Sequence, residues 1–310
     1  MKKQYIPYNK FLKKVKEALM NTPIILDGTA YAKEINEMLI KRVEKVREVS
    51  GAVPILATII VGDDPASVTY VRMKGNACKR AGIESLKIEM PGDTTTSGLI
   101  REIEKLNKNE NVHGILLQHP VPGGINEIEC FNAIDFKKDV DGVTYTSFAK
   151  VAMNEMLFGS STPLGIIRLL EKYGVQIEGK EAVVVGRSPI LGKPLAMMLL
   201  NKNATVTICH SKTLNIRDIV KRADIVVAAV GKPKFIKADW IKDNAVVVDA
   251  GYNPGNIGDT DLENIKERVF AYTPIPGGVG PMTIITLIEQ TVMSAEMKFG
   301  INQKYLFLKD

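Results

Sequence analysis

The sequence of 310 residues contains few cysteines, and they are far apart. Cys78, Cys130 and Cys209 are odd in number and form no CxxC pair. This spacing argues against a disulfide framework and against a zinc site built on cysteine. His113 and His119 also lack the spacing of metal ligands, so the sequence predicts no metal centre.

No apolar run approaches the length that a membrane span requires. The first 20 residues start with basic residues but contain neither a continuous apolar core nor a small-residue cleavage site, which argues against a secretory signal. An amphipathic helix is the simpler prediction for this segment. Together with the few cysteines, these absences favour a reducing, cytoplasmic setting.

Long runs of one charge are also missing. The net charge is +6, yet the sequence has no run of five basic residues and no basic stretch interleaved with aromatic residues. This argues against a nucleic-acid interface and suits anionic small ligands such as phosphates or polycarboxylates. The composition, 45% apolar and 25% charged, is that of an ordinary globular chain, and its length allows two domains.

From Gly179 onward, apolar strand-like runs alternate with helix-like segments. The strand-like runs are AVVV, ATVTIC, DIVVAAV and NAVVVDA, and the helix-like segments include PLAMMLLNKN and NIRDIVKRA. Nearly continuous Val and Ile runs are typical of parallel strands that are covered on both faces. We therefore predict a doubly wound, Rossmann-type NAD(P)-binding domain over residues 151–281.

The first half shows the same alternation with different residues. PILATIIVG, SLKIEM and VHGILLQHP predict strands with helices between them. We therefore expect an α/β fold of two α/β domains with a cleft between them, the first over residues 1–150, with the boundary near the turn residues GSSTPLG. The periodic segment that begins at Pro281 predicts a long helix over residues 282–310, which we expect to pack back on the first domain.

The stretch GRSPILGKP nearly matches two phosphate-binding loops. Five residues separate Gly186 from Gly192 where nucleotide hydrolases have four, and the dinucleotide fingerprint needs a glycine where Ser188 stands. A simple strand-to-helix turn, with Pro194 at the first helical position, is the alternative. However, GRS, CHS, AVGKP and DAGYN all follow predicted parallel strands, where this fold binds its ligands, and this favours a binding loop.

Tyr70 and Lys74 lie four residues apart in ASVTYVRMK, which places them on one face of a helix. Such a pair can stack on a ring and move a proton beside it, although a surface contact is the commoner meaning of this spacing. Short-chain dehydrogenases place a similar pair after the glycine loop, whereas here it precedes Gly186, so that family is disfavoured. Taken alone, Gln118 in LLQHPVP is a surface amide and Asp141 in KKDVDG a turn former.

The segment TPIPGGVGPMT can bring its backbone close to a flat ligand and present amides to it. The motifs ASVTYVRMK, LLQHPVP, KKDVDG, VVVGRSPILGKP, CHSKT and TPIPGGVGPMT occur in this order in the bifunctional methylenetetrahydrofolate dehydrogenase/methenyltetrahydrofolate cyclohydrolase family. The sequence resembles that family over residues 25–298.

The resemblance implies that methylenetetrahydrofolate gives a hydride to NADP and that water opens the methenyl product to formyltetrahydrofolate. It also implies a homodimer that acts in one-carbon metabolism and purine biosynthesis, with neither a nucleic-acid nor a membrane partner. Both steps would share the cleft. Tyr70 would stack on the folate, Lys74 would assist proton movements, Gln118 would orient Lys74, and Asp141 would anchor the pterin.

Further binding residues follow from the same resemblance. The substrate would also meet Leu117, His119, Pro276, Gly277, Gly278, Val279, Gly280 and Pro281. The cofactor would meet Gly186, Arg187, Ser188, Ser211 and Tyr252. NAD-specific folds often place an acidic residue after the second strand, whereas here His210, Ser211 and Lys212 stand there, which favours a cofactor with a 2′-phosphate.

The chain departs from the commonest family sequence in three places. It reads VTYTSFAKVAM after Gly142, Ser160 and Ser161 stand where Pro and Cys are common, and Tyr252 stands where Ile is common. None of these replaces a proposed catalytic residue. Two alternatives stay open: a dehydrogenase with weak or absent cyclohydrolase activity, and a non-catalytic protein that binds a dinucleotide or folate.

Overall fold

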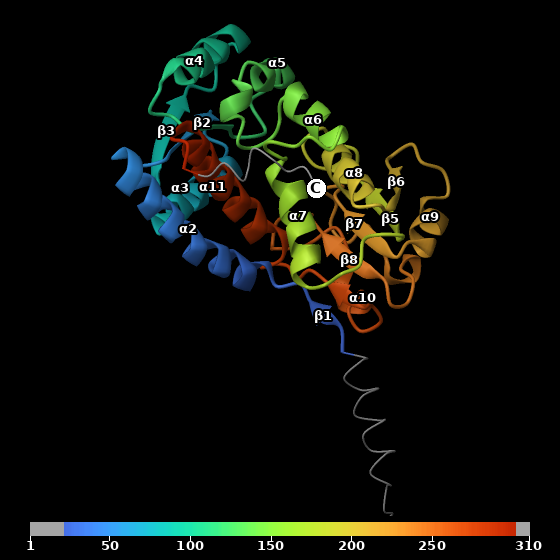
Figure 1. The fold of residues 1–310 in the computed structure, drawn as a ribbon. Coiled ribbons are helices and arrows are strands. Elements are labelled where there is room, and N and C mark those ends of the chain that lie inside the picture. Colours follow the sequence, from blue (N-terminus) through green and yellow to red (C-terminus); the bar gives the residue numbers. More distant parts are fainter. Residues whose placement is uncertain (1–21, 302–310) are drawn as a thin grey trace, which may run out of the picture.

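The computed structural model describes residues 22–301 and contains two parallel β-sheets surrounded by helices (Figure 1). A three-stranded sheet has the order β3-β2-β4, and a six-stranded sheet has the order β1-β9-β8-β7-β5-β6. The predicted two-domain α/β class is confirmed. The helix predicted for the first 20 residues lies outside the described residues.

The first half of the chain forms the smaller sheet and the helices around it. Its strand β2 carries six consecutive buried residues after Ile55, so the strand is covered on both faces as its sequence predicts. The elements of this half are α2 (Gly28–Ser50), β2 (Ile55–Val61), α3 (Pro65–Ala81), β3 (Glu84–Met90), α4 (Thr96–Lys108), β4 (Gly114–Leu117), α5 (Glu127–Asn132), η1 (Phe136–Lys138) and α6 (Tyr145–Ala152).

The second half forms most of the larger sheet. Its elements are α7 (Ser161–Lys172), β5 (Glu181–Val185), α8 (Gly192–Asn201), β6 (Thr205–Cys209), α9 (Ile216–Arg222), β7 (Ile225–Ala228), η2 (Ala238–Trp240), β8 (Val246–Asp249), α10 (Leu262–Ile265), β9 (Ala271–Tyr272) and α11 (Val279–Lys298). Each strand-like run of the sequence analysis falls on a strand here, and all the pairings within this sheet are parallel.

Helices α8 and α11 have bounds that differ from those considered from the sequence. Helix α8 begins at Gly192, so Pro194 is its third residue and not its first; a proline is still tolerated there because the amides of the first turn have no partner within the helix. Helix α11 begins at Val279 and ends at Lys298, short of the predicted 310, because Gly300 follows in the left-handed conformation (φ +65°). Residues 302–310 lie outside the described part of the chain.

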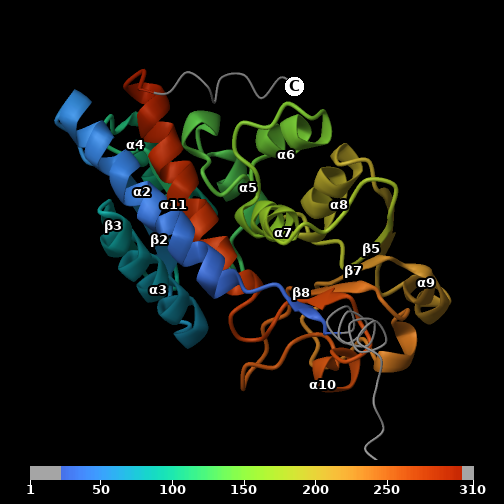
Figure 2. The ribbon, with the colours of Figure 1, turned by 60° about the horizontal axis from the view of Figure 1, so that its bottom comes forward.

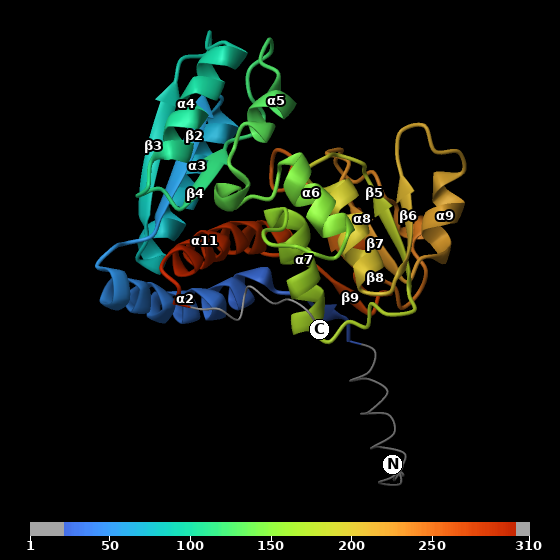
Figure 3. The ribbon, with the colours of Figure 1, turned by 45° about the horizontal axis from the view of Figure 1, so that its top comes forward.

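The two halves share helices, a strand and a core. Strand β1 (Ile24–Ile25) comes from the N-terminal side of the chain but pairs with β9, so it completes the larger sheet. Helices α2 and α11 lie side by side and join the two sheets (Figures 2 and 3). One apolar cluster includes Leu39 of α2, Leu116 of β4, Ile166 of α7 and Val184 of β5. This shared core fixes how the loops of one sheet face those of the other.

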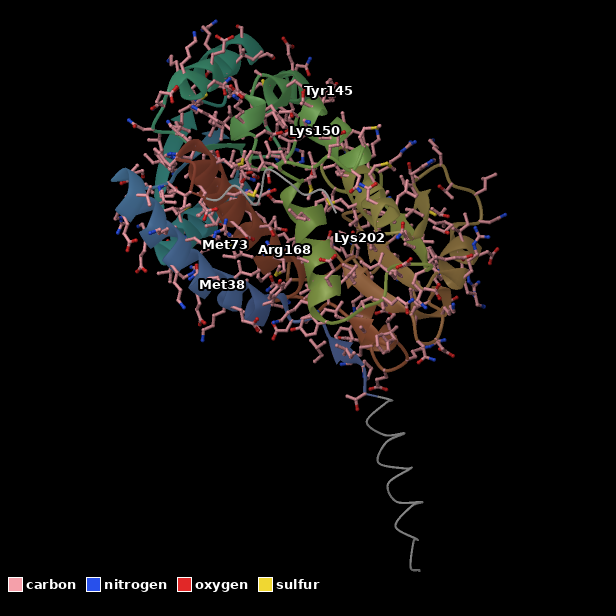
Figure 4. The ribbon with its side chains drawn as sticks, viewed as in Figure 1. Met38, Met73, Tyr145, Lys150, Arg168 and Lys202 are labelled. Carbon is pink, nitrogen blue, oxygen red and sulfur yellow. The ribbon has the colours of Figure 1, made fainter. Side chains whose placement is uncertain are left out.

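Ion pairs add to the helix contacts at this junction. Arg168, which Figure 4 labels on α7, pairs with Glu289 of α11. Arg42 of α2 pairs with Glu289 at 2.8 Å and with Glu296 at 2.7 Å. Within residues 22–301, no helix combines the length and the apolar character that crossing a membrane requires.

Candidate functional site

Helix α3 brings Tyr70 and Lys74 to one face. The helix starts where the side chain of Asp64 accepts a hydrogen bond from the Ser67 amide, and Pro65 occupies its first position. Lys74 is only 9% exposed, although it is a lysine. Its burial requires a polar partner, because a buried ammonium without one is costly.

That partner is Gln118, which directly follows β4. Lys74 Nζ donates to Gln118 Oε1 at 3.0 Å, and Gln118 Nε2 donates to the carbonyl of His119 at 2.7 Å. The two bonds together fix which end of the amide faces the lysine. The Gln118 backbone amide also continues the sheet by donating to the Ile59 carbonyl at 2.8 Å. The strand therefore holds the residue that orients the lysine.

Asp141 lies close enough to Lys74 for each group to change the pKa of the other. Burial lowers the pKa of Lys74, and the Asp141 carboxylate opposes that change. Burial raises the pKa of Asp141, and the Lys74 ammonium opposes that change. Three separate segments thus bring a lysine, an amide and a carboxyl group together in surroundings that disfavour charge.

Tyr70 links this group to the larger sheet. Its ring centroid lies 5.3 Å from that of Tyr252, with an interplanar angle of 72°, which is an edge-on contact. Burial, and to a lesser degree Tyr252, raises the pKa of Tyr70 to about 12, so its hydroxyl is neutral near pH 7. Tyr252 is 60% exposed and stands on the loop after β8. The contact joins the predicted folate side to the predicted cofactor side.

The glycine-rich loop before α11 packs on the first turn of α2. Thr29 donates its amide to the Gly277 carbonyl at 2.9 Å, and a Cβ on Gly28 would lie 1.8 Å from the Gly278 oxygen. Such an approach is possible only because Gly28 has no side chain. Pro276 of this loop and Gly280 in the first turn of α11 are exposed.

The remaining predicted substrate residues differ in their exposure. Leu117 packs in the apolar cluster beneath α4 and is 2% exposed. His119 is exposed, and its Nδ1 lies 2.7 Å from Glu127 Oε1. Val279 is buried in the shared core, whereas Pro281 is half-buried. Their substrate contacts stay predictions.

The predicted cofactor loop follows β5 and depends on two glycines. Gly186 has φ +138°, and a Cβ there would lie 2.2 Å from the carbonyl oxygen of Ala229. A Cβ on Gly192 would lie 2.2 Å from the Gly186 oxygen, so α8 approaches the end of β5 very closely. These are two of the functions that glycines serve in the dinucleotide fingerprint.

Ser188 explains how the loop forms without a middle glycine. Its Oγ accepts hydrogen bonds from the amides of Leu191 at 3.1 Å and Gly192 at 3.3 Å, so the hydroxyl stabilises the start of α8. The hydroxyl proton is left to donate to a ligand. Arg187 and Ser211 are exposed at the same edge, because β5 and β6 pair with Val185 opposite Cys209.

The sequence reasoning missed two buried aspartates that order the neighbouring loops. Asp249 accepts hydrogen bonds from the amides of Gly251, Asp259 and Thr260, and burial raises its pKa. Asp259 accepts from the amides that follow β7, at Val230, Gly231 and Lys232. These carboxylates set the loop that carries Tyr252. An aspartate directly after a run of valines, as in VVVDA, was the available signal.

A cavity of about 740 Å³ lies elsewhere, at the start of α4, and its lining includes Thr95, Ser97, Arg101 and Gly124. It contains none of the predicted site residues. We place the site at Lys74, Gln118 and Asp141 and not at this open cavity, because titratable groups with shifted pKa values cluster at functional sites. Among residues 22–301, no three His, Cys, Asp or Glu side chains are arranged to hold a metal ion.

The chain matches two family models in sequence. Residues 26–141 match the tetrahydrofolate dehydrogenase/cyclohydrolase catalytic domain, and residues 160–299 match the NAD(P)-binding domain of the same family. The chain is 66% identical over 278 residues to bifunctional protein FolD 1 of Colwellia psychrerythraea, covering 89% of this chain and 99% of the relative.

Solved structures show the same likeness. The bifunctional FolD methylenetetrahydrofolate dehydrogenase/cyclohydrolase of Campylobacter jejuni superposes with a TM-score of 0.87 at 39% identity, covering 89% of this chain and 100% of that chain. The FolD enzyme of Trypanosoma brucei, complexed with NADP cofactor and an inhibitor, gives a TM-score of 0.86 at 35% identity, covering 89% and 98%.

Proposed function

The chain belongs to the tetrahydrofolate dehydrogenase/cyclohydrolase family, and from that premise we propose that both of its reactions take place between Lys74 and Tyr252. The protein is a bifunctional enzyme of folate one-carbon metabolism. It oxidises 5,10-methylenetetrahydrofolate to the methenyl compound with NADP and hydrolyses that compound to 10-formyltetrahydrofolate.

The observation that carries the assignment of hydrolysis is the buried hydrogen bond from Lys74 to Gln118 beside Asp141. Because burial lowers the pKa of Lys74, the amine is available as a general base. A cationic methenyl ligand lowers its proton affinity further by like-charge repulsion. Gln118 Oε1 accepts a hydrogen bond from Lys74 Nζ in a fixed direction, so the nitrogen lone pair can point toward the attacking water.

Lys74 can carry out both proton transfers of the hydrolysis. Neutral Lys74 takes a proton from water while the water oxygen forms a bond to the methenyl carbon. The resulting carbinol opens when one carbon–nitrogen bond breaks, the Lys74 ammonium protonates the leaving ring nitrogen, and the carbinol hydroxyl loses its proton to solvent. The sum is one water consumed and one proton released. The lysine returns to its neutral state for the next turnover.

Asp141 and Tyr70 serve to hold the folate. Asp141 accepts hydrogen bonds from donor groups of the pterin, and these donors stabilise the carboxylate against the burial that raises its pKa. Tyr70, half-buried on α3, stacks on the ring system. The backbone of residues 276–281, together with Leu117 and His119, completes the substrate side.

The loops of the larger sheet fit an NADP molecule. NADP held there would supply the hydride acceptor. Gly186 would let the backbone approach the pyrophosphate closely, and the Ser188 hydroxyl would donate a hydrogen bond to it. Arg187 and Ser211 are exposed where a 2′-phosphate can meet them, and no acidic side chain replaces them there. Tyr252 borders the nicotinamide.

We infer a folate-binding domain over residues 1–150 and an NADP-binding domain over residues 151–281, with the last helix returning to the first. The contacts of α11 with α2 and α3 support that return. The homodimer and the link to purine biosynthesis rest on the family resemblance. The cytoplasmic setting rests on the few cysteines, because Cys78, Cys130 and Cys209 are free and buried.

One assay tests the proposed function. The purified protein is mixed with methylenetetrahydrofolate and either NADP or NAD, and the absorbances of the reduced nicotinamide and of the methenyl compound are followed. We expect NADP reduction without accumulation of the methenyl compound. Accumulation in the wild-type protein would instead indicate a dehydrogenase without cyclohydrolase activity, and no reduction of either cofactor would indicate a non-catalytic binding protein.

A further inference from the structure

Gln290 is a buried polar residue in the middle of α11, only 4% exposed. Its side chain makes three hydrogen bonds with backbone groups of two distant segments. Nε2 donates to the carbonyls of Val140 at 2.7 Å and Gly159 at 2.8 Å, and Oε1 accepts from the Gly159 amide at 2.8 Å. Both segments lie outside helices and strands, so the amide of Gln290 takes the place of a sheet or helix partner.

The two segments also touch one another around Asp141. A Cβ on Gly142 would lie 2.3 Å from the carbonyl carbon of Gly159, and Ser160 Oγ donates to the Gly142 carbonyl at 2.8 Å. The backbone carbonyls on both sides of Asp141 therefore accept hydrogen bonds. Gln290 donates to the Val140 carbonyl, and Ser160 donates to the Gly142 carbonyl. These two bonds hold the backbone on both sides of Asp141.

We propose that Gln290 is a positioning residue for Asp141, which it holds at the place where the carboxylate meets the folate. The proposal rests on the role of Asp141 given above. A group that anchors the substrate must be held to a fraction of an ångström. A displacement of about 1 Å can lower the reaction rate on the order of a hundredfold. Without the amide of Gln290, three buried backbone groups lose their partner, and the segment of Val140 moves to find another.

A double-mutant cycle tests this proposal. Gln290→Met, which keeps the length but removes the hydrogen bonds, is compared with Asp141→Asn and with the variant that carries both. The control is Thr286→Val, a buried residue one turn earlier on α11 whose hydroxyl has no hydrogen-bond partner among the described residues. KM and kcat are measured for methenyltetrahydrofolate hydrolysis, and KM for NADP is measured in the oxidation.

Gln290→Met raises the folate KM about ten- to a hundredfold and leaves the NADP KM nearly unchanged, while Thr286→Val changes neither. In the Asp141→Asn background, Gln290→Met adds almost nothing, because the group that it positions is already lost. If Gln290→Met does not fold, Gln290→Asn replaces it in the same cycle, because it keeps a buried amide but is too short to make the bonds to Val140 and Gly159 in their present geometry.

The outcomes separate the two assignments. In one outcome, Asp141→Asn raises the folate KM strongly while Gln290→Met raises it by the same factor with and without Asp141. Such independent effects would show that Gln290 supports the fold only, and the positioning role would be wrong. An unchanged folate KM in Gln290→Met would overturn it as well. If Asp141→Asn itself leaves the folate KM unchanged, the proposed folate role of Asp141 fails, and the positioning role falls with it.

Discussion

The folate side and the cofactor side of this enzyme are built in different ways. On the folate side, Lys74 and Gln118 are buried and already bonded to one another, with Asp141 beside them. On the cofactor side, Arg187 and Ser211 are exposed. The buried Asp259 there bonds to backbone amides of the loop that follows β7. The side that handles protons is thus built from buried side chains that bond to one another, whereas the side that holds the cofactor presents exposed side chains to it.

This difference suits the two tasks. A general base needs a shifted pKa, and burial is what shifts it, so the lysine must be enclosed by the protein itself. Holding a dinucleotide needs backbone that can be approached and charges that can reach the phosphates, which exposed loop residues provide. The comparison predicts that substitutions on the two sides separate the two reactions.

The largest expected effect is on hydrolysis in Lys74→Met. Removing the base should slow methenyl hydrolysis by about 10²–10⁴-fold, since that is the usual contribution of general acid–base catalysis. Some NADP-dependent oxidation should survive, because hydride transfer needs chiefly the alignment of the two carbons. Stopped-flow absorbance with added methenyltetrahydrofolate measures the loss. A folded variant that binds folate and hydrolyses it at nearly the wild-type rate would show that Lys74 is not the base.

The next effect concerns Arg187 on the cofactor side. Arg187→Ala should weaken NADP binding by about 1.5–3 kcal/mol, the value of a hydrogen bond to a charged group, and weaken NAD binding much less. Isothermal titration with both cofactors measures the difference, and Arg217, an exposed arginine on α9 paired with Asp239, offers a control in Arg217→Ala. Equal losses for the two cofactors would mean that Arg187 does not contact the 2′-phosphate.

A smaller effect follows from a third buried titratable group on the folate side. His113 is 2% exposed, and burial lowers its pKa to about 4. Between that value and the ordinary 6.5, the unfolded chain binds more protons than the folded one, so stability falls as the pH falls. From about pH 7 to about pH 5, this residue should cost about 2 kcal/mol of unfolding free energy.

His113→Asn cannot titrate and keeps an acceptor for the Ile55 amide, which donates to His113 Nδ1 at 3.1 Å. Urea unfolding at the two pH values should therefore show that the variant loses less unfolding free energy on acidification than the wild type does. Thr286→Val changes a buried side chain without removing a titratable group, and this control should leave the acid loss unchanged. Parallel losses in His113→Asn and the wild type would contradict this explanation.

The smallest effect is expected at the ring contact that joins the two sides. Tyr252→Ile removes the edge-on contact with Tyr70, which is worth about 0.5–1.5 kcal/mol, so the folate KM should rise about two- to tenfold. Tyr252→Phe keeps the ring and should behave like the wild type. A rise of equal size in both variants would assign the effect to the hydroxyl and not to the ring contact.

The sequence predicts the regular parts of this fold well. Continuous valine runs such as AVVV and VVVD are strands, because only a strand covered on both faces uses such residues without alternation. The spacing of Tyr70 and Lys74 also predicts their shared helix face. The pairing of β1 with β9 could not be predicted, because two residues carry no periodicity and their partner lies at the other end of the chain.

The contacts that complete the site are harder to foresee. Gln290 lies within an apolar helical pattern, and nothing in its neighbours shows that its amide bonds to Val140 and Gly159. Asp249 and Asp259 act through backbone amides, which every residue possesses. Motifs therefore locate the side chains that we propose to contact ligands, whereas only the tertiary structure reveals the groups that hold those side chains in place.

One crossed comparison tests the account most directly. The two half-reactions are measured separately in Lys74→Met and Arg187→Ala, with methenyltetrahydrofolate added for hydrolysis and with NADP titrated for oxidation. The account predicts that Lys74→Met loses hydrolysis and keeps its NADP affinity, while Arg187→Ala loses NADP affinity and keeps hydrolysis. Equal losses of both reactions in both variants would contradict a buried folate side that works independently of the cofactor loops.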